Sequence, residues 1–277
     1  MSQAFLKIVG DGHVHLHPHF HLKLAFDCLV ANLSQQAQTV WPGAAAAPWQ
    51  LVFLAERRGD NFFERLKAGR IDPAAAGLEI LSADEGGSLL LRHHTGGRLC
   101  LVAGRQIITR ERLEILGLVL REELPDLLSA QEVLERIRQA GGVPVLPWAL
   151  GKWWGARGRL IRQLILAKRR GELALGDSAL RPRLWPEPIG MRQARARGLT
   201  ILPGSDPLPL AGEERRMGAY GFVYEGPFDL EQPARAARAL VAEQAARLRP
   251  AGRRNNTALM LQRLYRLRLA KSAGQIT

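Results

Sequence analysis

Cysteine is scarce in this sequence, and no long apolar run is present. The 277 residues include two cysteines, Cys28 and Cys100, which lie far apart within apolar surroundings. That usage excludes a disulfide framework and a cysteine-rich zinc site, so both are interpreted as small buried thiols. No apolar run approaches the ~20 residues that span a bilayer, and the first four residues lack the features of a secretion signal. We therefore expect no membrane span and a cytoplasmic protein.

Acidic residues are outnumbered by basic ones. The chain has 39 Lys and Arg against 26 Asp and Glu, a formal net charge of +13. Such a surplus favours anionic partners. Only six of the 39 are Lys, however, and the Arg residues are spread over many predicted helices without a recognised nucleic-acid module. The composition therefore favours a small anionic, phosphorylated substrate over nucleic acid, and it leaves the oligomeric state open.

Histidine is concentrated in one place. Five of the seven histidines alternate in the segment Asp11-Gly12-His13-Val14-His15-Leu16-His17-Pro18-His19-Phe20-His21. The apolar residues 5–9 before it predict a strand, along which alternate side chains share one face. Neutral imidazoles are common metal ligands, and Asp11 could orient one of them. Because Pro18 is expected to end the strand, His13 and His15 are the primary candidates; a solvated histidine run is the alternative.

Short apolar strands alternate with amphipathic helices along the chain, which predicts a mostly parallel α/β sheet, closed or open. We predict one domain over residues 1–248. The basic segment 249–277 is predicted to form a helix docked through Leu261, Leu264 and Leu267. Strands are predicted at residues 5–15, 50–55, 77–82, 88–92, 99–103, 113–118, 143–146, 173–175 and 199–202, and helices at 22–33, 61–68, 130–140, 156–168, 189–197 and 230–248.

Polar residues follow several of the predicted strands. Ligands collect at the carboxyl ends of parallel strands, so these positions are candidates for a site. His13 and His15 end the first strand, Glu56 follows the second, and Asp206 follows the strand at residues 199–202. Two histidines with carboxylates from other strands form the donor set of a hydrolytic metal centre. A turn or helix-capping role is the alternative for Asp206.

The motifs resemble those of the polymerase-and-histidinol-phosphatase (PHP) superfamily of metallohydrolases over about residues 5–210. The resemblance is carried by His13-x-His15 after the first strand, Gly141-Gly142 before a late strand, and Gly204-Ser205-Asp206. It implies a distorted (β/α)7 barrel similar to a TIM barrel, with metal ions at the carboxyl ends of its strands and phosphoesters as substrates.

The sequence departs from the family pattern at several ligand positions. Ala55-Glu56-Arg57 replaces Thr-Asp-His, Gln106 replaces a bridging Glu, Glu114 replaces a His, and Pro207-Leu208 after Asp206 removes a late His. The resemblance therefore implies a divergent member whose site holds one or two ions of Zn, Mn or Fe.

These observations assign a role to each candidate residue. The predicted function is that of a metal-dependent hydrolase, with the phosphoesterase activity implied by the resemblance. Arginine pairs bidentately with phosphate, which makes it suited to an anionic substrate. The predicted ligands are His13, His15, Glu56 and Asp206, with His17 and Glu114 in a second tier; Glu56 and Asp206 are the predicted catalytic residues, and Arg57, Arg105, Asp177 and Arg181 are the predicted substrate contacts.

Two other functional classes remain open. A scaffold that has lost its ligands would bind without turnover, and a basic nucleic-acid-associated protein would bind with a steep salt dependence. Trp148, Trp153 and Trp154 follow a strand end, where they could stack on a ring or form a packed lid. His93 and His94 are predicted to lie in a hairpin turn.

Overall fold

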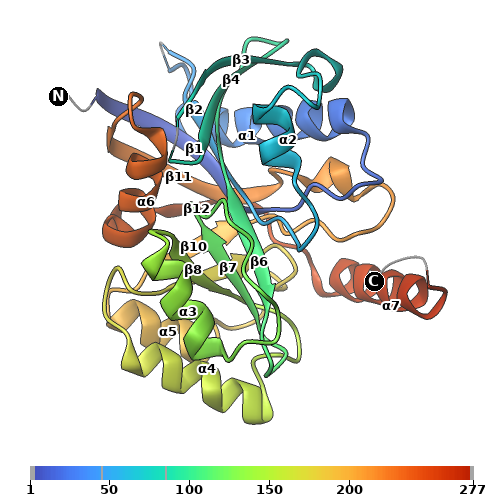
Figure 1. Ribbon diagram of the computed structural model, residues 1–277, viewed down its shortest axis with the longest axis vertical. Coiled ribbons are helices and arrows are strands. Elements are labelled where there is room, and N and C mark those ends of the chain that lie inside the picture. The colour runs from blue at the N-terminus through green and yellow to red at the C-terminus, as the bar shows by residue number, and fades with distance from the viewer. Residues whose placement is uncertain (1–3, 45, 85, 275–277) are drawn as a thin grey trace.

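The computed structural model describes residues 4–44, 46–84 and 86–274, which form two β-sheets flanked by helices (Figure 1). The strands are β1 (Ala4–Val14), β2 (Trp49–Leu54), β3 (Leu78–Ala83), β4 (Ser88–His93), β5 (Arg98–Val102), β6 (Gly104–Ile108), β7 (Glu114–Leu118), β8 (Val143–Pro147), β9 (Ala174–Ser178), β10 (Ile201–Gly204), β11 (Tyr220–Phe228) and β12 (Arg249–Gly252). The α-helices are α1 (Leu22–Val40), α2 (Phe62–Lys67), α3 (Ala130–Gln139), α4 (Gly155–Ala167), α5 (Ile189–Ala196), α6 (Pro233–Glu243) and α7 (Thr257–Ser272), with short 3-10 turns η1 (Ala74–Ala76), η2 (Glu213–Arg216) and η3 (Ala245–Arg247).

Both sheets mix parallel and antiparallel strands. The seven-stranded sheet has the order β12-β11-β1-β2-β5-β4-β3, and the five-stranded sheet has the order β10-β9-β8-β7-β6. The predicted parallel core exists as β1-β2-β5 in one sheet and β8-β9-β10 in the other. The strands directly next to these cores, β11, β4 and β7, run antiparallel to them.

The prediction of a distorted (β/α)7, TIM-like barrel is wrong. The described residues form two separate sheets and no closed barrel. One reason is β11, which the sequence analysis missed: it pairs with β1 from Ala4 to Gly10 and takes the edge that a closing strand would need. The five-stranded sheet reaches β1 at its far end, where the N–H of Asp206 donates to the carbonyl of His13 at 3.0 Å.

Three apolar clusters hold these layers together. The first lies between the seven-stranded sheet and helices α1 and α2. The second lies between the five-stranded sheet and helices α3, α4 and α5, in the lower half of Figure 1. The third joins residues of both sheets and of α6, and it includes Phe53 and Phe222, which are fully buried. Burial of this apolar surface is the main force that fixes the sheets against each other.

A register shift in β1 sets the direction of the histidines. Successive strand residues face opposite sides, so Ile8 packs between the sheets and Val9 packs on the side of α1. The pairing of β1 with β2 shifts between Asp11 and Val14, as at a β-bulge. Val14 then packs on the side of α1, and its neighbours His13 and His15 face the five-stranded sheet. Without the shift, His13 would share the face of Val9.

Helix α7 docks on a face offset from the predicted one. Its buried residues are Met260, Arg263 and Ala270, whereas Leu261 is 56% exposed. Leu267, from the predicted stripe, packs partly against the second cluster. Strand β12, within the segment 249–277, pairs with β11. In the described part of the chain no helix is long and apolar enough to cross a membrane.

Candidate metal centre

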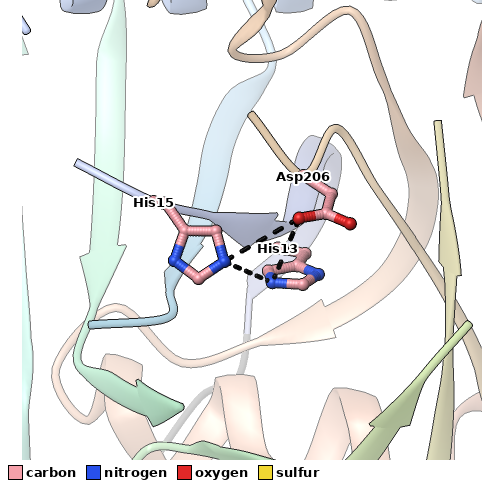
Figure 2. A group of neighbouring side chains, drawn as sticks. All are labelled: His13, His15 and Asp206. Atoms are coloured by element: carbon pink, nitrogen blue, oxygen red, sulfur yellow. Dashed lines mark hydrogen bonds and ion pairs between the residues drawn. The ribbon is translucent and has the colours of Figure 1, made fainter. Parts of the chain in front are cut away.

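Three side chains from two sheets converge at the end of β1. Figure 2 shows the imidazoles of His13 and His15 beside each other, with the carboxylate of Asp206 facing both. The two Nε2 atoms are 2.9 Å apart. Oδ1 of Asp206 lies 3.7 Å from Nε2 of His13 and 3.8 Å from Nε2 of His15. Both histidines are buried, so the three donor atoms form a compact, sheltered group.

Asp206 adopts an unusual backbone conformation. Its φ is +51°, in the left-handed region that costs energy for residues other than glycine and is least unfavourable for Asn and Asp. Two hydrogen bonds maintain it: its N–H donates to the carbonyl of His13, and its Oδ2 accepts from the hydroxyl of Ser178 at 2.9 Å. The carboxylate is therefore fixed with Oδ1 toward the histidines.

Close packing between β1 and β10 depends on two glycines. A Cβ on Gly204 would lie 2.5 Å from the Cβ of His13, and one on Gly12 would lie 2.7 Å from the carbonyl oxygen of Pro203. Both distances are shorter than real Cβ contacts allow. Glycine at these positions lets the backbone that carries His13 reach the loop that carries Asp206.

Asp11 joins the same two segments from beneath. Its carboxylate accepts the backbone N–H of His13 at 3.1 Å, of Ser205 at 2.9 Å and of Gly218 at 2.9 Å, together with the hydroxyl of Ser205. Complete burial raises the pKa of Asp11 to about 6, although these hydrogen bonds oppose the increase. Asp11 thus fixes backbone positions, whereas the sequence analysis expected it to orient an imidazole.

The electrostatics of the site favour a neutral imidazole at His15. Burial lowers the pKa of His15 well below its ordinary value, and the neighbouring His13 lowers it further. The backbone of Ala55 acts on His15 in the opposite direction and raises its pKa. Burial also lowers the pKa of His17 to about 4. Nε2 of His17 lies 3.1 Å from the carbonyl oxygen of Pro207. The His17 ring is therefore directed toward Pro207 and lies outside the group of His13, His15 and Asp206.

The donor set fits a divalent ion. Two imidazole nitrogens and one carboxylate oxygen, all within 4.8 Å of one another, are what Zn, Mn or Fe(II) accepts from a protein that leaves further positions open. The 2.9 Å between the two Nε2 atoms is short for two ligands of one ion. A small opening between the rings would therefore accompany binding.

The structure gives Glu56 and Arg105 other partners. Oε1 of Glu56 accepts the N–H of Phe63 at 3.1 Å, near the start of α2, and Oε2 lies 3.6 Å from Arg105. Burial raises the pKa of Glu56 to about 7, and the charge of Arg105 partly offsets this. Arg105 is itself buried, and it donates to the backbone carbonyls of Asp60 and Arg121 and to the side chain of Asn61. The roles predicted for both residues stay predictions.

The remaining predicted residues divide into two groups. The positive charge of Arg57 lowers the pKa of both His15 and His17, which places it near the histidines. Glu114 forms an ion pair with Lys152. Asp177 accepts both arms of Arg181, at 2.7 and 2.8 Å, and the hydroxyl of Tyr220 at 2.7 Å. This pair lines a separate cavity described below.

Sequence reasoning missed the residues that support Asp206. Ser178 ends β9 in Gly176-Asp177-Ser178, a pattern parallel to Gly204-Ser205-Asp206 that could have indicated it. Arg263 on α7 pairs with Glu213, and its Nη2 lies 3.4 Å from the carbonyl oxygen of Asp206. No local signal marks Arg263, because it is one basic residue among many in its helix.

A second His/Asp cluster lies at the hairpin of β4 and β5. Oδ1 of Asp27 lies 3.0 Å from Nε2 of His93 and 2.7 Å from Nε2 of His94. Lys23 reaches the same cluster, 2.8 Å from Oδ2 of Asp27 and 3.2 Å from His94. The ammonium group of Lys23 supplies the positive charge in this cluster. The contacts of Asp27 with His93 and His94 join α1 to the hairpin.

Known proteins provide three comparisons, two with the sequence and family models and one with the structure. No family model matches the sequence, and no curated protein matches it. The structure is similar to PsfC from Pseudomonas syringae PB-5123, with a TM-score of 0.55 and 14% identity over 95% of this chain and 99% of that chain. That likeness shows the fold alone.

Two further solved structures match less well. The lesion-specific endonuclease Q from Pyrococcus furiosus gives a TM-score of 0.47 and 14% identity over 86% of this chain and 56% of that chain. A two-domain protein from Bacteroides vulgatus ATCC 8482 is described as containing a predicted PHP-like metal-dependent phosphoesterase. It gives a TM-score of 0.43 and 13% identity over 91% of this chain and 66% of that chain. Scores at this level do not place the chain in the PHP superfamily.

Proposed function

We propose that this chain is a metal-dependent hydrolase of PHP type that cleaves phosphoesters, with one divalent ion held by His13, His15 and Asp206. The observation that carries the proposal is the convergence of three donor atoms from β1 and from the end of β10 within 4.8 Å. When bound, a divalent ion supplies an electrophile that polarises a phosphoryl oxygen and makes water more acidic.

The chain's own residues hold and prepare the site. The lowered pKa of His15 keeps that imidazole neutral, so that its nitrogen is available as a ligand at neutral pH. Ser178 holds Oδ2 of Asp206 and leaves Oδ1 free. Arg57, half-buried beside the histidines, is the proposed contact for the substrate anion because a guanidinium matches phosphate geometry.

Metal content measured by elemental mass spectrometry tests the proposal. Two variants remove ligands: His13→Ala/His15→Ala, and Asp206→Asn, which tolerates the left-handed φ and keeps an acceptor for Ser178. His94→Ala is the matched control, because it removes a histidine from the cluster that Lys23 occupies. We expect about one Zn, Mn or Fe per chain in the wild type and the control, and loss of the metal in both ligand variants.

Turnover separates the hydrolase from a scaffold. Metal-loaded protein is tested with p-nitrophenyl phosphate and bis(p-nitrophenyl) phosphate, with Asp206→Asn as the inactive control. Hydrolysis that requires His13, His15 and Asp206 supports the proposal. Stoichiometric metal without turnover would favour the binding scaffold, and no metal even after reconstitution would refute the metal centre itself.

A further inference from the structure

Two adjacent cavities lie away from the candidate metal centre. One has a volume of about 820 Å³ and the other about 620 Å³, and Arg181 and Glu187 line both. None of His13, His15 and Asp206 is among the described residues that line them. In β9 the side chain of Asp177 points into the larger cavity, whereas that of its neighbour Ser178 bonds to Asp206. The strand thus separates the cavities from the metal centre.

The larger cavity carries an excess of positive charge. Six arginines line it, against the acidic residues Asp177 and Glu187. Asp177 is engaged by Arg181, and Glu187 by Arg195 at 2.9 Å. In the part of the chain that the structure describes, the other four arginines, Arg170, Arg183, Arg253 and Arg254, have no acidic partner.

One of the arginines that line this cavity has a donor without a partner. Nη1 of Arg254 is buried and has no hydrogen-bond partner among the described residues, whereas its Nη2 lies 3.4 Å from the carbonyl oxygen of Arg183. A buried guanidinium nitrogen without an acceptor costs free energy, which a rotation of the Arg254 side chain toward an oxyanion in the cavity would recover. Phosphate suits clustered guanidinium groups, because its oxygens accept their paired N–H donors.

The smaller cavity is lined by aromatic rings. Trp148, Trp153, Trp154 and Trp185 all contribute to it, and these are four of the six tryptophans in the chain. Trp153 is fixed by a hydrogen bond from its Nε1 to the carbonyl of Pro147 at 3.1 Å. It also packs against Gly190, where a Cβ would lie 3.1 Å from the indole ring. Trp154 is 62% exposed at the edge.

We propose that the two cavities together bind a nucleotide, with its aromatic base against the tryptophans and its phosphate groups against the arginines. The base gains stacking and apolar burial, and the phosphates gain charge-assisted hydrogen bonds. Arg181 and Glu187 lie where the sugar joins the two parts. Cavities of this size fit a small molecule, whereas a nucleic-acid strand needs a continuous groove.

Isothermal titration calorimetry with adenosine diphosphate and inorganic pyrophosphate tests the proposal, in EDTA and about 0.15 M salt. Arg170→Ala/Arg183→Ala/Arg253→Ala removes three exposed guanidinium groups from the cavity. The matched control, Arg110→Ala/Arg136→Ala/Arg159→Ala, removes three exposed arginines elsewhere and lowers the net charge equally. Trp154→Ala removes the exposed ring, and its control is Tyr265→Ala, because Tyr265 is 63% exposed on α7.

We expect the cavity triple variant to weaken both probes about tenfold or more, and Trp154→Ala to weaken adenosine diphosphate about tenfold while pyrophosphate is unchanged. The two controls should bind like the wild type. So should His13→Ala/His15→Ala, which separates this site from the metal centre.

Several results would overturn the proposal. One is the absence of binding by either probe, and another is an equal loss in the two arginine triple variants, which would show only diffuse charge attraction. Loss of binding in His13→Ala/His15→Ala would place the probe at the metal centre. Displacement of adenosine diphosphate by a single-stranded oligonucleotide that binds more tightly and with a steep salt dependence would indicate a nucleic-acid surface.

Discussion

Removing the guanidinium of Arg263 is expected to destabilise the protein by about 3–5 kcal/mol, because it leaves a carboxylate buried without its counterion. The side chains of Arg263 and Glu213 are each 2% exposed. Nε of Arg263 donates to Oε1 of Glu213 at 2.9 Å, and a second bond joins Nη2 to Oε2. Arg216, at 3.6 Å from Glu213, compensates only part of the lost charge because it is partly exposed.

The assay is urea unfolding followed by tryptophan fluorescence, with the change in unfolding free energy taken from the midpoint at constant slope. Arg263→Met is compared with Arg268→Met, an exposed arginine on the same helix that should change stability by less than about 0.5 kcal/mol. The double variant Arg263→Met/Glu213→Gln should recover about 2 kcal/mol or more, since the amide still accepts the N–H of Leu208 without a buried charge.

The same substitution reaches the candidate metal centre. Nη2 of Arg263 lies 3.4 Å from the carbonyl oxygen of Asp206, so the loop that carries this proposed ligand loses a contact. Metal affinity should fall in Arg263→Met and stay unchanged in Arg268→Met. A cost below about 1 kcal/mol, or a double variant no more stable than Arg263→Met, would refute the argument from a stranded buried carboxylate.

Three further outcomes follow from the structure. Burial raises the pKa of Glu56 from 4.5 to about 7, so its contribution to stability is full below pH 4.5 and is lost as the pH rises to 7. Relative to Glu56→Gln, the wild type should therefore lose about 3 kcal/mol of unfolding free energy across that range. An equal pH dependence of the two proteins in urea titrations would contradict this. Gly204→Ala should lower the unfolding free energy by about 1–3 kcal/mol and abolish metal binding, because its Cβ would collide with His13. A stable variant that still binds metal would disprove the need for this close approach. Leu261→Gln should alter thermal stability by less than about 0.5 kcal/mol because that side chain is 56% exposed, and a larger loss would place it on the docked face of α7.

Local patterns predicted the parallel cores and the primary candidates of the site. The apolar run at residues 5–9 and the alternating histidines after it predicted a strand at residues 5–15, and in the structure β1 runs from Ala4 to Val14 with His13 and His15 on one side. Asp206 was a candidate because it follows a strand, and the structure brings it to the two histidines. These features depend on periodicity and chain order, which a sequence displays directly.

Other features depend on contacts between distant segments. The pairing of β11 with β1 opens the predicted barrel into two sheets, and no pattern near Tyr220–Phe228 announces its partner. Arg105, Asp177 and Arg181 follow predicted strands just as Asp206 does, yet the fold gives Arg105 backbone partners and joins Asp177 to Arg181. Strand ends identify polar candidates, but which of them meet is decided by tertiary packing.

The sequence by itself determined which residues can serve as ligands, because the two-residue spacing of His13 and His15 and the position of Asp206 after a predicted strand are local properties of the chain. Tertiary structure decided that they converge. The register shift in β1 turns the two imidazoles toward the second sheet, and glycine at position 204 lets the loop of Asp206 approach. The first effect arises from the pairing of β1 with β2, where Asp11 lies opposite Val52, and the second from packing between segments about 190 residues apart; hydrophobic periodicity carries no signal for either.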